Sequence, residues 1–156
     1  MGFTDSEIID IELQSPKKKF RINGDNTKII ELNPSDVNIV SRLRETYKKL
    51  DALAAEAGSL LADQEEVTTE EDLEKVSNAL TKLDKEMRDL IDYLFDGSVS
   101  SVIAENINLY SPVNGQFWFE HCIEVLSNLY SNNFQSEFKK MQARINKHTD
   151  KYTRKV

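Results

Sequence analysis

The chain has 156 residues, of which 39% are hydrophobic and 30% are charged. This length and apolar content suit one folded domain with extensions and exclude wholesale disorder. The net charge of −7 opposes general attraction to nucleic acid. The single cysteine excludes an internal disulfide and indicates a reducing compartment. No apolar run approaches the roughly 20 residues of a membrane-spanning helix, and the N-terminus lacks a signal-peptide pattern.

The first 33 residues carry the signals of a small antiparallel sheet. Residues 20–22 and 29–32 are short apolar runs on either side of a turn that begins Asn23-Gly24. Asn-Gly between such runs is the strongest local signal of a β-hairpin, because both residues tolerate positive φ. Residues 7–13 alternate in part, with apolar side chains on one side at Ile9, Ile11 and Leu13. We therefore predict a β-hairpin region over residues 1–33 with two or three strands.

Residues 34–156 are predicted to form a helical domain that opens with a long antiparallel hairpin. Its first helix, over residues 34–62, follows capping residues at Asn33-Pro34-Ser35. Its second helix, over residues 68–96, starts at a capping box with Thr68 as the cap and Glu71 reaching back. Each helix has an apolar seam at alternating spacings of three and four, which predicts antiparallel packing of the two. The first seam is Val40, Leu43, Tyr47, Leu50, Ala54, Ala57 and Leu61, and the second is Leu73, Val76, Leu80, Leu83, Met87, Leu90 and Leu94.

Two more helices complete the predicted domain. Residues 98–109 form a short helix, residues 111–115 a loop, and residues 116–150 a long C-terminal helix with a basic tail. The first half of this last helix carries more large apolar residues than one stripe can hold, so we expect it to be buried. Ile91 and Phe95 lie off the seam of the preceding long helix and need a third packing partner. The predicted class is mainly α (α+β), with a small N-terminal antiparallel sheet.

The sequence predicts no catalytic residue, no cofactor and no metal site. His121 and Cys122 are adjacent, and neighbours on a helix diverge by about 100°, so they cannot serve each other as base and nucleophile. Zinc-ligand spacing, a P-loop and a dinucleotide fingerprint are absent from the sequence. The acidic residues near Asp63, Glu65 and Glu66 are expected to form a solvated face. We therefore expect a protein that is not an enzyme.

The second half of the last helix carries the candidate partner-binding residues. A basic tail there contrasts with the acidic body, and it has three interpretations: contact with nucleic-acid phosphates, docking to an acidic protein surface, or solvated charge at a helix C-terminus. An apolar stripe beside it favours a protein partner, because purely electrostatic contact needs no apolar anchors. Heptad seams also pair with copies of themselves, which leaves a homo-oligomer open. The candidate residues are Phe134, Phe138, Met141, Ile145 and Tyr152 in the stripe, with Lys140, Arg144 and Lys147 beside it.

Two segments carry a resemblance to a known family. They are the hairpin followed by Leu32-Asn33-Pro34-Ser35-Asp36, and the aromatic helix start Phe117-Trp118-Phe119-Glu120 with its later Lys139-Lys140-Met141-Gln142. In these segments the chain resembles tail assembly chaperones of tailed phages and prophages of Gram-positive bacteria, although residues 96–114 do not match the family pattern. The resemblance implies binding to the tape measure protein and to tail tube subunits, in the cytoplasm of the bacterial host. It brings no catalytic or ligand-binding residue. A structural component of the virion, in the tail or connector, is the alternative, and a nucleic-acid-binding protein that uses the basic C-terminal helix is a more distant one.

Overall fold

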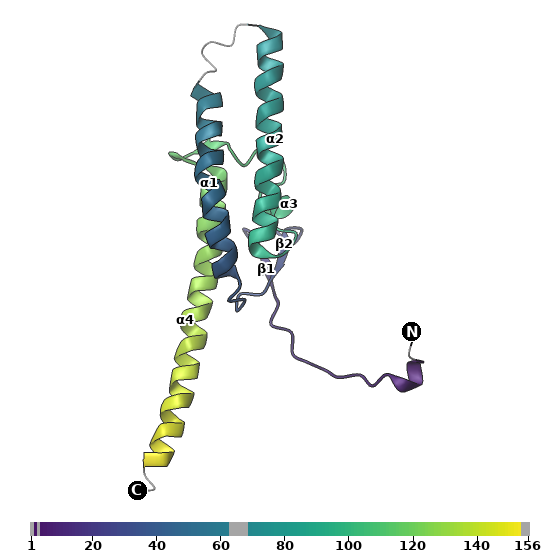
Figure 1. The fold of residues 1–156 in the computed structure, drawn as a ribbon, viewed down its shortest axis with the longest axis vertical. Coiled ribbons are helices and arrows are strands. Elements are labelled where there is room, and N and C mark those ends of the chain that lie inside the picture. Colours follow the sequence, from purple (N-terminus) through teal and green to yellow (C-terminus); the bar gives the residue numbers. More distant parts are fainter. Residues whose placement is uncertain (1, 3, 63–68, 154–156) are drawn as a thin grey trace.

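The computed structural model describes residues 2, 4–62 and 69–153. Helices α1 and α2 stand side by side as a hairpin, and α4 runs along α1 and projects beyond the end of that hairpin (Figure 1). The mainly helical class with a small N-terminal antiparallel sheet is confirmed. The elements in chain order are η1 (Asp5–Glu7), β1 (Lys18–Arg21), β2 (Ile29–Leu32), α1 (Ile39–Ala62), α2 (Glu70–Phe95), α3 (Ser100–Ile103), β3 (Pro112–Val113), β4 (Gln116–Phe117) and α4 (Trp118–Thr153).

Strands β1 and β2 form the predicted β-hairpin, with Phe20 opposite Ile30 in the antiparallel register. The turn between them has positive φ at Asn23 (51°) and Gly24 (72°), as an Asn-Gly hairpin turn requires. One face of β2 is buried, because Ile30 and Leu32 join the same hydrophobic core as the helices. A two-stranded ribbon is only marginally stable alone, so this packing is what holds the hairpin.

The third strand that the alternation suggested does not form. Residues 8–17 have no regular structure, and they extend away from the body as an arm (Figure 1). The side chains of Ile9, Ile11 and Leu13 are 86%, 83% and 87% exposed. The alternating segment is short. A strand also needs a neighbouring edge for its backbone hydrogen bonds, and among the described residues the arm lies beside none.

Because this arm buries almost nothing, its apolar side chains contribute little to folding. Replacing Ile9, Ile11 and Leu13 together with serine is expected to change the free energy of unfolding by less than about 1 kcal/mol. Urea unfolding followed by circular dichroism measures this change. A loss of several kcal/mol would show that the arm packs against the body.

Helix α1 begins at Ile39, five residues later than predicted. The capping residues instead form two successive turns. The side chain of Asn33 accepts a hydrogen bond from the backbone N–H of Ser35 at 3.0 Å, and that of Asp36 accepts one from Asn38 at 3.0 Å. These local side-chain bonds give the backbone an alternative to the helix, which delays its start.

The inner face of α1 shares Leu43, Leu50 and Ala57 with the predicted seam but differs from it at other positions. Val40 and Tyr47, which the prediction placed inside the hairpin, are exposed. Thr46 is buried instead. Apolar residues occupy neighbouring positions along α1. Two series of inner residues with alternating spacings of three and four therefore fit the sequence, and packing against the rest of the fold selects one of them. The observed inner residues are Ile39, Leu43, Thr46, Leu50, Leu53, Ala57 and Leu60.

Helix α2 has both of its ends capped. The side chain of Thr69 accepts a hydrogen bond from the backbone N–H of Asp72 at 3.1 Å, so the cap is one residue later than predicted; Thr68 lies outside the described residues. At the other end Asp96 takes a left-handed conformation with φ 50°, as a helix C-terminus commonly requires. The predicted seam is buried from Leu83 onward, whereas Leu73 near the start is exposed.

The segment after α2 differs from the prediction. Helix α3 spans only Ser100–Ile103 rather than residues 98–109, because α2 supplies hydrogen bonds that hold the chain in another shape. The carboxylate of Asp92 accepts from the backbone N–H groups of Val99 (2.9 Å) and Ser100 (2.8 Å). One turn earlier, Arg88 donates to the carbonyl of Ile107 at 3.0 Å, and one turn before that Asp84 accepts from the N–H of Leu109 at 2.8 Å.

The predicted loop over residues 111–115 forms the first strand and the turn of a second small hairpin, and the last helix begins at Trp118 rather than at the predicted residue 116 because residues 116–117 form the second strand. Strands β3 and β4 pair antiparallel across Asn114 and Gly115, which both have positive φ, 54° and 81°. This is the same Asn-Gly signal as in the first hairpin. Sequence reasoning passed over it because the flanking runs are only two residues long.

Helix α4 divides into a buried proximal half and an exposed distal half. The proximal half contributes Phe119, Ile123, Leu126 and Tyr130 to the core, as the density of apolar residues predicted. Tyr130 stacks on Phe95 of α2 with ring centroids 5.9 Å apart. This contact provides the third packing partner that the off-seam residues of α2 required.

Arg42 joins the start of α1 to the end of α2. Its Nε donates to the carbonyl of Leu94 at 2.9 Å, and its terminal nitrogen lies 2.8 Å from Asp36 Oδ2. Partial burial acts to raise the pKa of Asp36, but hydrogen bonds from Arg42 and from the Asn38 backbone outweigh it and lower the pKa below 3.8. The interaction therefore stabilises the fold above the unfolded-state pKa and is lost as pH falls through the lower folded-state pKa.

We expect Arg42→Ala to lower the free energy of unfolding by about 2 kcal/mol at neutral pH, because it leaves a carboxylate and a helix-terminal carbonyl without their charged donor. The deficit relative to the unaltered protein should hold down to about pH 5 and shrink below about pH 4, as Asp36 is protonated. Urea unfolding at a series of pH values tests this. A deficit independent of pH would show that the Asp36 contact contributes nothing.

Candidate protein-binding surface

The distal half of α4 presents an apolar stripe on a helix that projects from the body (Figure 1). Phe138, Met141 and Ile145 are 57%, 48% and 51% exposed. The stripe begins at Phe134, which packs against the core and contacts the ring of Phe138 at a centroid distance of 6.3 Å. Single exposed apolar residues are ordinary, but a contiguous exposed patch marks an interaction site. The spacing of four, three and four residues keeps these side chains on one face of the helix.

Basic side chains accompany the stripe. Lys139, Lys140, Arg144 and Lys147 are exposed, and residues 139–147 include no acidic residue. Lys140 lies 3.5 Å from Glu137, but both side chains are largely solvated, and such pairs contribute little to stability. The positive charge of this half-helix therefore remains available to a partner.

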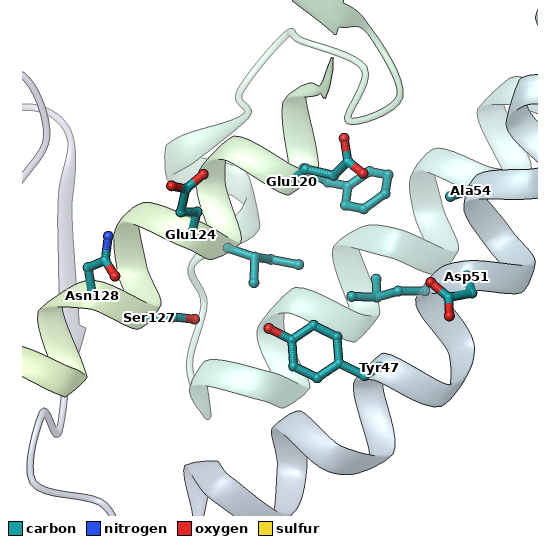
Figure 2. A pocket seen from close by; sticks show the side chains of 10 residues that line it. Tyr47, Asp51, Ala54, Glu120, Glu124, Ser127 and Asn128 are labelled. Carbon is teal, nitrogen blue, oxygen red and sulfur yellow. The ribbon is translucent and has the colours of Figure 1, made fainter. Parts of the chain in front are cut away.

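Beside the proximal half of α4, a groove runs between that helix and α1. Its upper part has a volume of about 360 Å³ and an apolar floor that includes Leu50 and Ala54 of α1 and Phe119 and Ile123 of α4. Figure 2 shows Tyr47 and Asp51 on α1 facing α4 across this space, with the Tyr47 hydroxyl directed toward Ser127. The rim is acidic, because Asp51, Glu120 and Glu124 all line it.

The groove continues toward the distal half of α4. A second hollow of about 260 Å³ shares Ser127 with the upper part and is lined by both helices. Val40 of α1 and Phe138 of α4 lie at its far end, so the groove leads directly onto the exposed stripe. Its apolar lining residues are Ile39, Val40, Leu43, Tyr130, Phe134 and Phe138. We call the two hollows together the α1–α4 groove.

No family model matches this sequence, and neither a curated protein nor a solved structure is similar to it.

Cys122 and His121, the candidates for chemical reactivity, lie where neither is activated by a neighbouring group in the described part of the chain. Cys122 is buried, and burial raises the pKa of its thiol to about 11, so it stays protonated and unreactive near neutral pH. His121 is exposed and its ring lies against Trp118, with centroids 5.2 Å apart. Both line a third hollow of about 290 Å³ beside the first hairpin. Within residues 2, 4–62 and 69–147, no group of three or more His, Cys, Asp or Glu is placed to hold a metal ion.

The helices of the described residues also do not meet the requirements of a membrane-spanning helix. None of them combines the length and the apolar character that crossing a membrane requires. Asp63, Glu65 and Glu66, predicted as a solvated acidic face, lie outside the described residues.

The structure places the sequence-predicted binding residues together in part. Phe138, Met141 and Ile145 share one exposed face, and Lys140, Arg144 and Lys147 are exposed beside it. Phe134 is half-buried and belongs to the junction with the core rather than to the exposed stripe. The side chain of Tyr152 lies outside the described residues. The α1–α4 groove was not predicted from the sequence, because α1 and α4 are far apart along the chain. The polar residues on the rim of the groove also follow no periodic pattern.

Proposed function

We propose that this protein binds an amphipathic helix of another protein through the distal face of α4, and that it acts as a tail assembly chaperone in the cytoplasm of a bacterial host. The observation that carries the proposal is the exposed stripe of Phe138, Met141 and Ile145 on a helix that projects past its own core. Solvation of such a stripe is unfavourable; complete burial of a Phe, Met or Ile side chain gains about 1.5–3 kcal/mol, and about half of this is still to be gained for side chains that are half exposed. A partner helix that covers the stripe recovers this free energy.

The charge distribution supports reversible holding of an aggregation-prone client. The chain as a whole carries a net charge of −7, which keeps a complex soluble by mutual repulsion. The apolar binding face is narrow and is flanked by lysine and arginine, so it favours a client helix with acidic residues beside an apolar seam. An apolar seam flanked by exposed charges suits binding that must later be released.

The identity of the client rests on the family resemblance. Tail assembly chaperones are expected to hold the long tape measure protein until tail tube subunits polymerise around it, so the proposed clients are the tape measure protein and the tube subunit. The β-hairpin, the turns at Asn33–Asp36 and the aromatic start of α4 are the segments of that resemblance, and here they build the body from which the stripe projects.

Co-expression with the tape measure protein encoded in the same genome tests the proposal. The expected result is a soluble complex that co-purifies, and precipitation of the tape measure protein when it is expressed alone. Failure of the two proteins to co-purify, with the tape measure protein equally soluble in both cases, would contradict the proposal.

A structural role in the virion is the alternative that the same surface allows, since a projecting helix can also be covered permanently. Mass spectrometry of purified particles distinguishes the two roles. A chaperone is expected to be present in the infected cell and absent from the finished particle, whereas a tail or connector component remains in the particle at fixed stoichiometry.

A further inference from the structure

We propose that the α1–α4 groove is the docking site for the distal half of α4 from a second copy of this chain, so that two copies form an antiparallel, two-fold symmetric dimer. Each copy supplies both parts of the contact, a groove on its body and a helix that projects from it (Figure 1). A two-fold axis therefore fills both grooves at once. Such self-complementary pairing is the commonest form of protein dimer.

The first support is the continuity of one face of α4. The groove-lining residues of its proximal half and the stripe of its distal half follow each other at spacings of three and four, which keeps them on the same side of the helix. In the proximal half α1 lies beside this face, and in the distal half the face is open. The residues in order are Ile123, Ser127, Tyr130, Phe134, Phe138, Met141 and Ile145.

The second support is that one register of the two-fold pair brings the exposed stripe to the upper groove. When two copies of α4 run antiparallel about an axis at the level of Asn132, residues equally distant from Asn132 in sequence come to the same height, because the rise per residue is constant. Met141 of one copy then meets the level of Ile123 of the other. Ile145 in the same way meets Phe119. The exposed apolar residues thus reach the apolar floor of the upper groove.

The third support is charge. In the same register, residues 139–147 of one copy pass the upper groove of the other. The upper groove has Asp51, Glu120 and Glu124 on its rim, while residues 139–147 of the entering helix carry only positive charge. When the distal half of α4 from the second copy places its apolar stripe on the groove floor, its positive charges lie near a negatively charged rim. This complementarity favours an antiparallel pair of two copies.

The dimer does not depend on the proposed function, since it needs only the chain itself. If both proposals hold, the dimer covers the stripe until a client helix competes for it. The two proposals can fail separately, because the oligomeric state is measured without any client.

Charge exchange between copies gives the sharpest test. We would prepare Asp51→Lys with Glu124→Lys in one variant and Lys140→Glu with Arg144→Glu in another. In each variant alone, the groove rim and the entering helix carry charge of the same sign, so two copies repel each other at both symmetric contacts. The dimer dissociation constant measured by sedimentation equilibrium is expected to rise at least tenfold above that of the unaltered protein. Mixed in equal amounts, the two variants attract at both contacts and are expected to form a heterodimer. Circular dichroism confirms that each variant is folded.

Cysteine cross-linking provides a second test that leaves the charges unchanged. The cysteine variants are made in a Cys122→Ala background. Ser131 lies in the groove wall near the two-fold axis, so Ser131→Cys is expected to form a disulfide between residue 131 of one copy and residue 131 of the other. Asn132→Cys lies one residue further along α4, about 100° around the helix from Ser131 and outside the groove lining, and serves as the matched control that is expected not to cross-link. A monomeric unaltered protein at about 100 μM, a mixture of charge variants that stays monomeric, or equal cross-linking at both positions would each overturn the proposal.

Discussion

Replacing Phe138, Met141 and Ile145 together with serine is expected to weaken binding of the client helix at least a hundredfold and to leave the fold intact. The three side chains are about half exposed in the free protein, so their loss costs the monomer little. In the complex they are the apolar anchors, and truncation of an interface anchor commonly costs more than about 1 kcal/mol. Loss of three such anchors, about 3 kcal/mol in total, corresponds to about two orders of magnitude in the dissociation constant.

A matched control makes this result specific. The variant with Ile9, Ile11 and Leu13 replaced by serine removes three side chains of similar kind that are even more exposed, but from the arm rather than from α4. Titration calorimetry against a peptide from the tape measure protein is expected to give unaltered affinity for the arm variant. Equal weakening by both variants would mean that binding depends on overall apolar content and not on the stripe.

Phe95→Ala is expected to lower the free energy of unfolding by about 3–5 kcal/mol, because it removes a large buried ring and leaves a cavity that the surrounding helices cannot fill. Phe95 is fully buried at the end of α2 and stacks on Tyr130 of α4. Its ring is therefore one of the contacts that hold α4 to the hairpin. A fall in the melting temperature on the order of 10 °C should accompany the change.

The control for this variant is on the same helix. Leu73 is an apolar residue of the predicted α2 seam that remains exposed near the helix start, so Leu73→Ala should cost less than about 1 kcal/mol. Urea unfolding of the two variants separates them. Similar costs for both would show that the far end of the hairpin is as well packed as the end that contacts α4.

The sequence was sufficient to predict the elements whose signals are local. The Asn23-Gly24 turn, the Asp96 end of α2 and the division of α4 into dense and sparse halves depend on residues close in sequence, and all three were predicted correctly. The second Asn-Gly turn, at Asn114 and Gly115, had the same signal, but its flanking strands of two residues each gave no alternation to detect.

Features that depend on distant contacts were not predictable in this way. The seam of α1 was predicted correctly at Leu43, Leu50 and Ala57. It was wrong at its ends, because Ile39 and Val40 are both apolar, as are Leu60 and Leu61, and only packing in three dimensions selects between neighbours. The short α3 likewise reflects polar contacts from α2, where Arg88 donates to the carbonyl of Ile107 and Asp84 accepts from the backbone N–H of Leu109. The stripe was visible as a periodicity of its own, whereas the groove beside it needed the placement of α1 against α4.

Site-specific photo-cross-linking along α4 tests most directly whether the apolar face is covered by another polypeptide. A benzoylphenylalanine in place of Met141 lies on the stripe, and one in place of Ala143 lies on the opposite face of the same helix turn. During tail assembly in the host, the account predicts that the probe at 141 captures a tail protein or a second copy of this chain, and that the probe at 143 captures neither. No product at 141, or equal capture at both positions, would contradict it.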